Sequence, residues 1–292
     1  MALNLALRAA TRPGDLVALE SPTYYGFLQI LQSLGLRALE IPTHPRTGIS
    51  LEALELALAA HPVKAVLMMA NVSNPTGATL SDAAKKRLVE LLAAAKVPLI
   101  EDHIYAELQF DSPAPRPAKA FDRAGNVMLC SSFSKTLSPG LKVGWIEPGR
   151  WRDRIRMLKF VSSGGQNELV ELAVAEMLES GGYERSLRQL RRRFAAQVDA
   201  ARGVIAESFP RGTRVTRPSG AYILWVELPK ECDSVALFEQ LLERGITIAP
   251  GPMFSASQRY RNCLRLSVGQ VWDERHERAL RAVGRLAQEL FG

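Results

Sequence analysis

A lysine that lies among hydroxyl groups is the feature of this chain best suited to chemistry. Lys135 follows Ser132 and Ser134, and a second cation, Lys142, comes seven residues later. A lysine amine becomes a usable nucleophile toward an aldehyde when burial or a neighbouring cation lowers its pKa. Hydroxyls and a fixed positive charge can hold a phosphate. This combination predicts a site for pyridoxal phosphate, with Lys135 forming an imine with the aldehyde.

The element that must position Lys135 is an apolar run at 127–130, which predicts a buried strand. Lys135 then stands where the strand gives way to a loop, and loops on rigid scaffolds often carry catalytic groups. Strand parity would let Ser132 and Ser134 face the phosphate together while Lys135 turns to the other side. Taken alone, the segment equally fits a polar strand end with solvated lysines.

A second strand end carries Asn74, which follows the apolar run 65–70 within the segment Ser-Asn-Pro-Thr-Gly at 73–77. Ligands of open α/β sheets bind at the carboxyl ends of parallel strands. The same segment also fits a simple Pro-Gly turn before the next helix. The two interpretations are compatible.

A third apolar run, at 97–100, ends in Glu101 and Asp102, with Tyr105 three residues further on. A carboxylate at position 102 would keep a pyridine nitrogen protonated and so make the ring an electron sink. Asn74 and Tyr105 could hydrogen-bond the 3-oxygen of that ring. A single acid at a strand end is usually structural, but these groups on three successive strand ends form a much rarer combination.

With these residues assembled, the chain resembles the fold type I, class I/II aminotransferases over essentially its whole length. Within them it is most similar to the aminotransferase-like domain of MocR-type regulators of the GntR family, and next to aminoadipate and kynurenine aminotransferases. The resemblance includes the segment Glu-Ser-Pro-Thr-Tyr-Tyr-Gly at 20–26 and the segment Asn-Cys-Leu-Arg-Leu-Ser-Val-Gly at 262–269. It implies the fold of a pyridoxal phosphate-dependent transferase.

The resemblance also implies residue roles. Lys135 would be the catalytic residue and would bind the cofactor covalently, and Arg265 would bind the substrate α-carboxylate through a bidentate guanidinium, together with Asn74. The cofactor-binding residues would be Tyr24 stacked on the ring, Asp102 at its nitrogen, Asn74 and Tyr105 at its phenolic oxygen, and Ser132, Ser134 and Lys142 at its phosphate.

The chain departs from the family pattern at several points. It begins in what resembles the middle of a family helix, so we expect it to lack the preceding strand and the glycine-containing phosphate loop. We expect the chain to lack the winged-helix segment that precedes this domain in the regulators, and we expect DNA binding only if such a domain lies upstream in a full-length protein. Lys142 stands where many relatives have arginine, and His103 stands where the regulator branch would have an acid.

Composition and element order predict a mostly parallel α/β domain and a smaller α+β C-terminal domain, with a boundary near residue 190 (1–190 and 191–292). The chain has 292 residues, 47% hydrophobic and 23% charged. The segments expected in the sheets are 16–19, 36–41, 65–70, 99–102, 127–131, 141–146, 222–228, 246–249 and 264–268. The expected helices are 26–34, 51–60, 81–96, a broken helical region at 166–209, 234–244 and one from 273.

Several classes of protein are disfavoured. No apolar stretch is long enough to span a membrane and no secretory signal is present, so a cytoplasmic location is expected. The three cysteines and four histidines are scattered, which argues against disulfides and metal sites. The net charge is +7, and the basic segment 185–193 predicts a solvated helix face rather than a nucleic-acid site.

The predicted reaction is the transfer of an amino group between an amino acid and a 2-oxo acid, with Lys135 carrying the proton. The alternative is a cofactor- or effector-sensing domain of a MocR/GntR-type regulator with little turnover. Further alternatives are an inert remnant with an exposed sheet edge and a lyase or decarboxylase on the same scaffold. Family resemblance also implies a homodimer.

Overall fold

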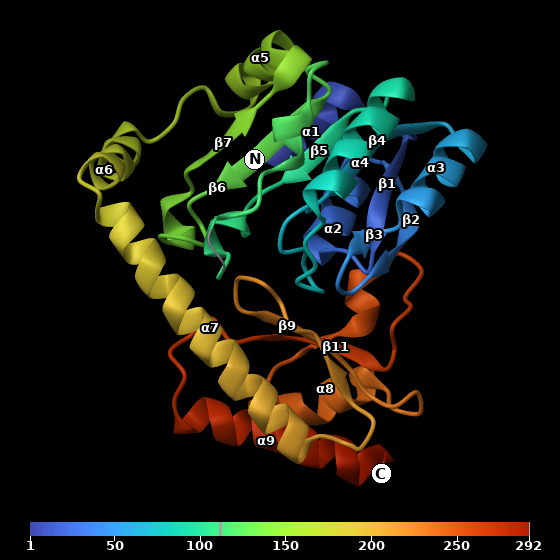
Figure 1. Cartoon of the computed structure of the whole chain (residues 1–292), viewed down its shortest axis with the longest axis vertical. Helices are drawn as coiled ribbons and strands as arrows, with labels where there is room; N and C mark the ends of the chain where they lie inside the picture. The colour runs from blue at the N-terminus through green and yellow to red at the C-terminus, as the bar shows by residue number, and fades with distance from the viewer. Residues whose placement is uncertain (111–112, 292) are drawn as a thin grey trace.

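A seven-stranded sheet forms the centre of the larger part of the molecule in the computed structural model, which describes residues 1–110 and 113–291 (Figure 1). Its strand order is β3-β2-β1-β4-β5-β6-β7. The five central strands are parallel, whereas β3 and β7 pair antiparallel at the two edges. The strands are β1 (Leu16–Ser21), β2 (Arg37–His44), β3 (Gly48–Ile49), β4 (Val63–Met68), β5 (Leu99–Asp102), β6 (Val127–Ser132) and β7 (Gly144–Glu147). The predicted mostly parallel α/β fold is confirmed.

Helices cover both faces of this sheet and begin at recognisable caps. Ser50 and Ser81 each accept a hydrogen bond from the backbone N–H three residues later, so each satisfies a donor that the first helical turn leaves free. The helices of this part are α1 (Ala2–Ala10), α2 (Tyr25–Ser33), α3 (Leu51–Ala60), α4 (Asp82–Ala94), α5 (Arg152–Ser163) and α6 (Glu168–Glu179).

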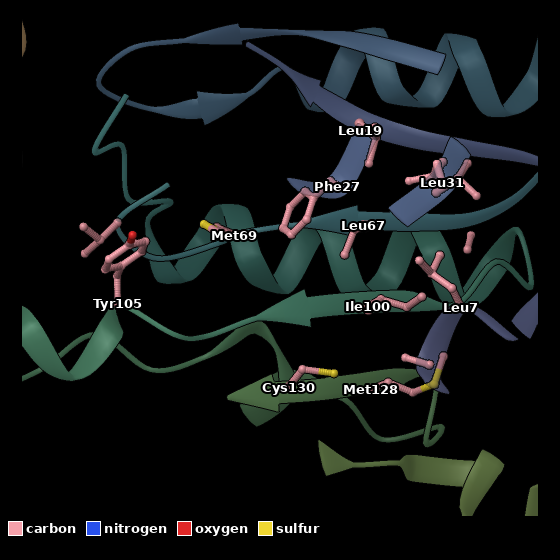
Figure 2. Packing of buried hydrophobic residues seen from close by; sticks show 14 of the residues in the cluster. Leu7, Leu19, Phe27, Leu31, Leu67, Met69, Ile100, Tyr105, Met128 and Cys130 are labelled. Atoms are coloured by element: carbon pink, nitrogen blue, oxygen red, sulfur yellow. The ribbon is translucent and has the colours of Figure 1, made fainter. Parts of the chain in front are cut away.

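Alternation along the strands divides the core into two layers. On β1, Val17 and Leu19 pack with α1 and α2, whereas Ala18 belongs to the layer formed with α3 and α4. Figure 2 shows the first layer, in which Ile100 and Met128 face the helices and Tyr105 lies beyond the end of β5. Burying both faces of the central strands fixes their register, so their carboxyl ends are held at one edge of the sheet.

The smaller part contains a four-stranded antiparallel sheet of order β10-β11-β9-β8. Its core includes Leu224, Val226, Leu264 and Leu266, which pack with helices on one side (Figure 1). The elements are β8 (Arg214–Val215), β9 (Ile223–Glu227), α8 (Ser234–Glu243), β10 (Ala249–Pro250), β11 (Cys263–Ser267) and α9 (Glu274–Phe291).

One helix, α7 (Gly182–Ser208), runs along the side of the molecule and contributes to both cores (Figure 1). Its N-terminal half supplies Tyr183 and Phe194 to the larger core, and its C-terminal half supplies Val198 and Ile205 to the smaller one. Gly181, which has a φ of +70°, separates α7 from α6, as the predicted break indicated. The domain boundary near residue 190 stays a prediction.

Three local expectations differ from the structure. The strand expected at 246–249 is reduced to β10, because Ile246 N donates to Leu241 O and completes the end of α8 instead. Helix α5 was not predicted, since only Ile155 of its side chains is buried. Strand β6 ends at Ser132, so Ser134 lies in the following turn. Strand alternation therefore does not place Ser134 on the same side as Ser132, contrary to expectation. Within 1–110 and 113–291, no helix has the length and apolar character needed to cross a bilayer.

Candidate active site

Asp102 is the last residue of β5 and only 5% of it is exposed. Its Oδ1 accepts a hydrogen bond of 3.1 Å from Ile104 N. Burial raises the pKa of its carboxyl to about 7, against the favourable effects of that hydrogen bond and of the Lys135 charge. The side chain is therefore an acid whose ionised form would be stabilised by a cationic N–H donor.

Lys135 lies in the turn that follows β6, with its Nζ 5.7 Å from the centroid of the Tyr105 ring. Burial, and then the positive charge of Arg265, lower the pKa of the Lys135 amine, while Asp102 opposes the shift. A lowered pKa increases the fraction of the amine that is unprotonated and nucleophilic near neutral pH.

Tyr105 joins this group from the loop after β5. Its ring is buried and meets the ring of Tyr222, on the smaller part, edge to face at 5.9 Å. Burial raises the pKa of the Tyr105 phenol well above its ordinary value, so the hydroxyl stays protonated and can donate a hydrogen bond.

Arg265 reaches the site from β11, and its Nη1 donates to Asn74 Oδ1 at 3.4 Å. Its guanidinium carbon lies 5.3 Å from the Phe254 ring centroid and 5.7 Å from that of Tyr25. The Arg265 Nε is buried and makes no hydrogen bond within the described part of the chain. The guanidinium thus keeps donor capacity for an anion, and its contact with Asn74 joins the two parts of the molecule.

Tyr24 lies at the start of α2, half-buried, with its ring 5.5 Å from that of Phe27 and edge to face with it. The ring folds back over Gly26, where an added Cβ would come within 2.4 Å of a ring carbon. Gly26 is therefore required for this ring position.

The three residues predicted to bind phosphate flank the Lys135 turn. Ser132 and Ser134 are half-buried, and Ser134 N donates to the Ser132 hydroxyl at 3.4 Å. Lys142 is exposed and has a φ of +56° directly after the 3-10 helix η3 (Pro139–Leu141). These hydroxyls and the ammonium lie at opposite ends of one short loop.

The structure thus brings together Lys135, Asp102, Tyr105, Asn74 and Arg265 through direct contacts or charge interactions. Sequence reasoning missed Phe254 and Tyr222, which come from the smaller part. No motif signalled them, because single aromatic residues at these positions look like ordinary core residues.

Comparison with known proteins identifies the family. The model of the family described as aminotransferase class I and II matches residues 1–283. The chain belongs to this family. Among its relatives are two HTH-type transcriptional regulators of Escherichia coli, YjiR and YdcR, each 41% identical to this chain. The match with YjiR covers 97% of this chain and 60% of the regulator, and the match with YdcR covers 99% and 62%.

Aminotransferases are also among the relatives of this class I/II aminotransferase domain. The 2-aminoadipate transaminase of Thermus thermophilus is 31% identical over 99% of the chain and 74% of its own length. The crystal structure of alpha-aminoadipate aminotransferase from the same organism, complexed with N-(5'-phosphopyridoxyl)-L-leucine, superposes with a TM-score of 0.93 at 29% identity, covering 99% of this chain and 75% of that one. The resemblance to both regulators and aminotransferases is confirmed.

The chain spans about 60% of the length of the two regulators.

The crystal structure of kynurenine aminotransferase from Pyrococcus horikoshii also superposes on this chain, with a TM-score of 0.92 and 28% identity over the whole of this chain and 73% of that one. The larger sheet, the smaller sheet and their connection therefore follow the aminotransferase fold.

Proposed function

We propose that this chain binds pyridoxal 5'-phosphate and transfers an amino group between an amino acid and a 2-oxo acid. The observation that carries the proposal is the pairing of a buried acid, Asp102, with a half-buried amine of lowered pKa, Lys135. Membership of the class I/II aminotransferase family supports it.

The residues present fit this cofactor. Asp102 is a buried acid, and a cationic N–H donor would stabilise its ionised form. A protonated pyridine nitrogen is such a donor. The buried Tyr105 phenol can donate to the ring oxygen, with Asn74 as the second proposed partner there. Tyr24 would stack on the ring, and Ser132, Ser134 and Lys142 would hold the phosphate.

The bound cofactor would supply an electron sink for the negative charge that develops at the substrate Cα. Lys135 would hold the cofactor at its aldehyde, and the Lys135 amine would carry the proton at the substrate Cα. Arg265 would orient the substrate through its α-carboxylate. Asn74 Oδ1, which accepts from Arg265 Nη1 at 3.4 Å, would hold the guanidinium for that task. Lys135 is thus the proposed catalytic residue, with Arg265 and Asn74 as substrate-binding residues.

The decisive test is whether the cofactor becomes fixed on Lys135. The purified chain would be mixed with pyridoxal phosphate, reduced with borohydride and analysed by peptide mass spectrometry. We expect label on the Lys135 peptide, none on that peptide in Lys135→Ala, and parent-like labelling in Lys64→Ala, which removes an exposed lysine. Scattered or absent label in the parent chain would contradict the proposal.

Turnover would be measured with amino acids of different side-chain class and a 2-oxo acid acceptor. In Lys135→Ala the rate should fall by about 10²–10⁴-fold, the usual contribution of one general acid–base group, or more because the covalent link is also lost. Transamination at the parent rate in Lys135→Ala would exclude Lys135 as the catalytic residue.

The similarity to HTH-type transcriptional regulators favours a second candidate function, that of an effector-sensing domain. In that case borohydride would still label Lys135, but amino acids would change the cofactor absorbance without multiple turnovers. DNA binding would then require an upstream DNA-binding domain in a full-length protein. For either function we propose a homodimer, a cytoplasmic location and a domain boundary near residue 190.

A further inference from the structure

The turn that carries Lys135 is held from one side by Tyr183. Thr136, the residue after Lys135, is only 3% exposed, and its hydroxyl lies 3.0 Å from the Tyr183 hydroxyl. The Phe133 ring, two residues before Lys135, packs edge to face against the Tyr183 ring at 5.7 Å. Tyr183 therefore contacts the turn on both sides of the lysine.

The Tyr183 hydroxyl also lies 2.8 Å from Glu107 Oε2. A phenol has one proton and an ionised carboxylate can only accept, so the phenol donates to Glu107 and accepts from the Thr136 hydroxyl. Burial and the bond to Glu107 raise the pKa of the Tyr183 phenol, while the Thr136 bond lowers it, as this direction of donation requires. The three groups form a directed chain from Thr136 to Tyr183 to Glu107.

Glu107 belongs to η1 (Ala106–Leu108), the 3-10 helix that begins directly after Tyr105. A second residue of α7 holds it, because Arg191 Nε donates to the Glu107 carbonyl at 2.7 Å. Tyr183, Leu187 and Arg191 are spaced by four residues and so share one face of α7. That face holds the segment carrying Tyr105 and the turn carrying Lys135 at the same time.

We propose that Tyr183 is a positioning residue that fixes the Lys135 amine over the Tyr105 ring by holding both segments to α7. The inference rests on the proposed role of Lys135 as the cofactor-binding amine. Tyr183 acts through Thr136, Phe133 and Glu107 rather than by touching the amine itself. Without its hydroxyl, the turn would keep the Phe133 contact and lose the hydrogen bond that anchors Thr136.

The test uses the chain without cofactor and follows the lysine itself. Competitive acetylation with acetic anhydride across a pH series, read by peptide mass spectrometry, gives the midpoint at which the Lys135 amine becomes reactive. Burial, the charge of Arg265 and the charge of Asp102 set this midpoint, and the uncharged Tyr105 ring lies 5.7 Å from the amine. In Tyr183→Phe we expect the midpoint to rise by about half a unit or more toward the ordinary lysine value, because a loosened turn lets water reach the amine.

Hydrogen–deuterium exchange supplies the second readout. The peptide covering 133–142 should exchange at least severalfold faster in Tyr183→Phe, while peptides of the smaller sheet keep their parent rates. Thr136→Val, which removes the same hydrogen bond from the other side, should move both readouts in the same direction. Thr136→Ser keeps the hydroxyl and should restore the parent values.

Tyr260→Phe is the matched control, because the tyrosine hydroxyl that it removes contacts Ser21 Oγ of β1 at 3.0 Å and not a residue of the Lys135 turn. It should leave the midpoint of Lys135 unchanged. An unchanged midpoint and unchanged exchange in both Tyr183→Phe and Thr136→Val would overturn the inference. A shifted midpoint in a chain that borohydride does not label would instead retain the positioning role and reject the proposed cofactor chemistry.

Discussion

Two adjacent acids on β5, Glu101 and Asp102, are both buried but accept different numbers of hydrogen bonds from the backbone. Glu101 is fully buried, and its two carboxylate oxygens accept hydrogen bonds of 2.8 Å from Ala118 N and 3.0 Å from Lys119 N. Asp102 accepts one, from Ile104 N, and otherwise meets the charge of Lys135. One acid therefore ties the sheet to η2 (Ala118–Phe121), and its neighbour keeps capacity for a partner outside the chain.

The difference shows why burial alone does not identify a functional acid. Burial raises the pKa of both carboxyls. Lysine charges act on both carboxyls, those of Lys85 and Lys119 on Glu101 and that of Lys135 on Asp102. What separates the two acids is that Glu101 accepts two backbone N–H groups and Asp102 only one. A buried acid whose two oxygens both accept hydrogen bonds from the backbone stabilises the fold. A buried acid with one such bond, next to a lysine, still has an oxygen available for chemistry.

The largest effect expected from this comparison is the loss of activity in Asp102→Asn. The amide can still accept from Ile104 N, but it has no charge with which to hold a pyridine nitrogen protonated. The rate of amino-group transfer should fall by about 10- to 1000-fold, since a neighbouring opposite charge moves a pKa by about 1–3 units. The measurement is steady-state turnover at saturating cofactor. Turnover at the parent rate would contradict the proposal that Asp102, unlike Glu101, acts in the reaction.

Glu101→Gln should instead act on the fold. The amide offers one acceptor oxygen to two backbone N–H groups, so one buried donor is left facing an NH₂ group. The free energy of unfolding should fall by about 1–3 kcal/mol, the cost of an unsatisfied buried polar group. Urea denaturation measures it, with Glu90→Gln as the control, because Glu90 is exposed and its 3.9 Å ion pair with Lys86 contributes at most about 1 kcal/mol. Equal stability of Glu101→Gln and parent would contradict the structural role.

A further expected effect is a difference in how the free energy of unfolding depends on pH. The carboxyl of Asp102 has a pKa of about 7 in the folded chain and an ordinary value of 3.8, so between these values the folded state binds more protons than the unfolded state. Its contribution to stability is present below pH 3.8 and is lost as pH rises toward 7, by at most about 1.4 kcal/mol per unit.

Asp102→Asn removes this contribution and leaves the other titrating groups in place. The difference in unfolding free energy between Asp102→Asn and parent, measured without cofactor, should therefore grow in favour of the variant from about pH 4 to about pH 7. Parallel pH profiles would show that folding does not raise the pKa of the Asp102 carboxyl.

Much of the site could be predicted from the sequence because parallel strands bring their carboxyl ends to one edge. Asp102 ends β5 and Lys135 follows β6, and because these strands are paired neighbours the proximity of the two residues follows from strand order alone. Arg265 lies 130 residues further along the chain than Lys135, on the other sheet. Only the family resemblance indicated it, since an arginine in an alternating strand is usually solvated.

The remaining features depend on tertiary packing that no local pattern encodes. Ser134 was expected to continue the strand, but β6 ends at Ser132 and the turn redirects the chain. Tyr183 lies 48 residues from Lys135 and looks like one apolar position of an amphipathic helix. Its partners, Thr136 and Glu107, become recognisable only when α7 is placed against the sheet.

Helix α7 connects the two cores of the molecule as one long continuous helix. Its 27 residues span about 40 Å, with Tyr183 packed in the larger core and Ile205 in the smaller one. The smaller core also holds Leu264 and Leu266, the neighbours of Arg265 on β11. A tilt of about one degree at the Tyr183 end moves the other end by roughly 0.7 Å, given a rise of about 1.5 Å per residue. A rotation of α7 relative to the larger core would therefore move the guanidinium of Arg265 relative to the amine of Lys135.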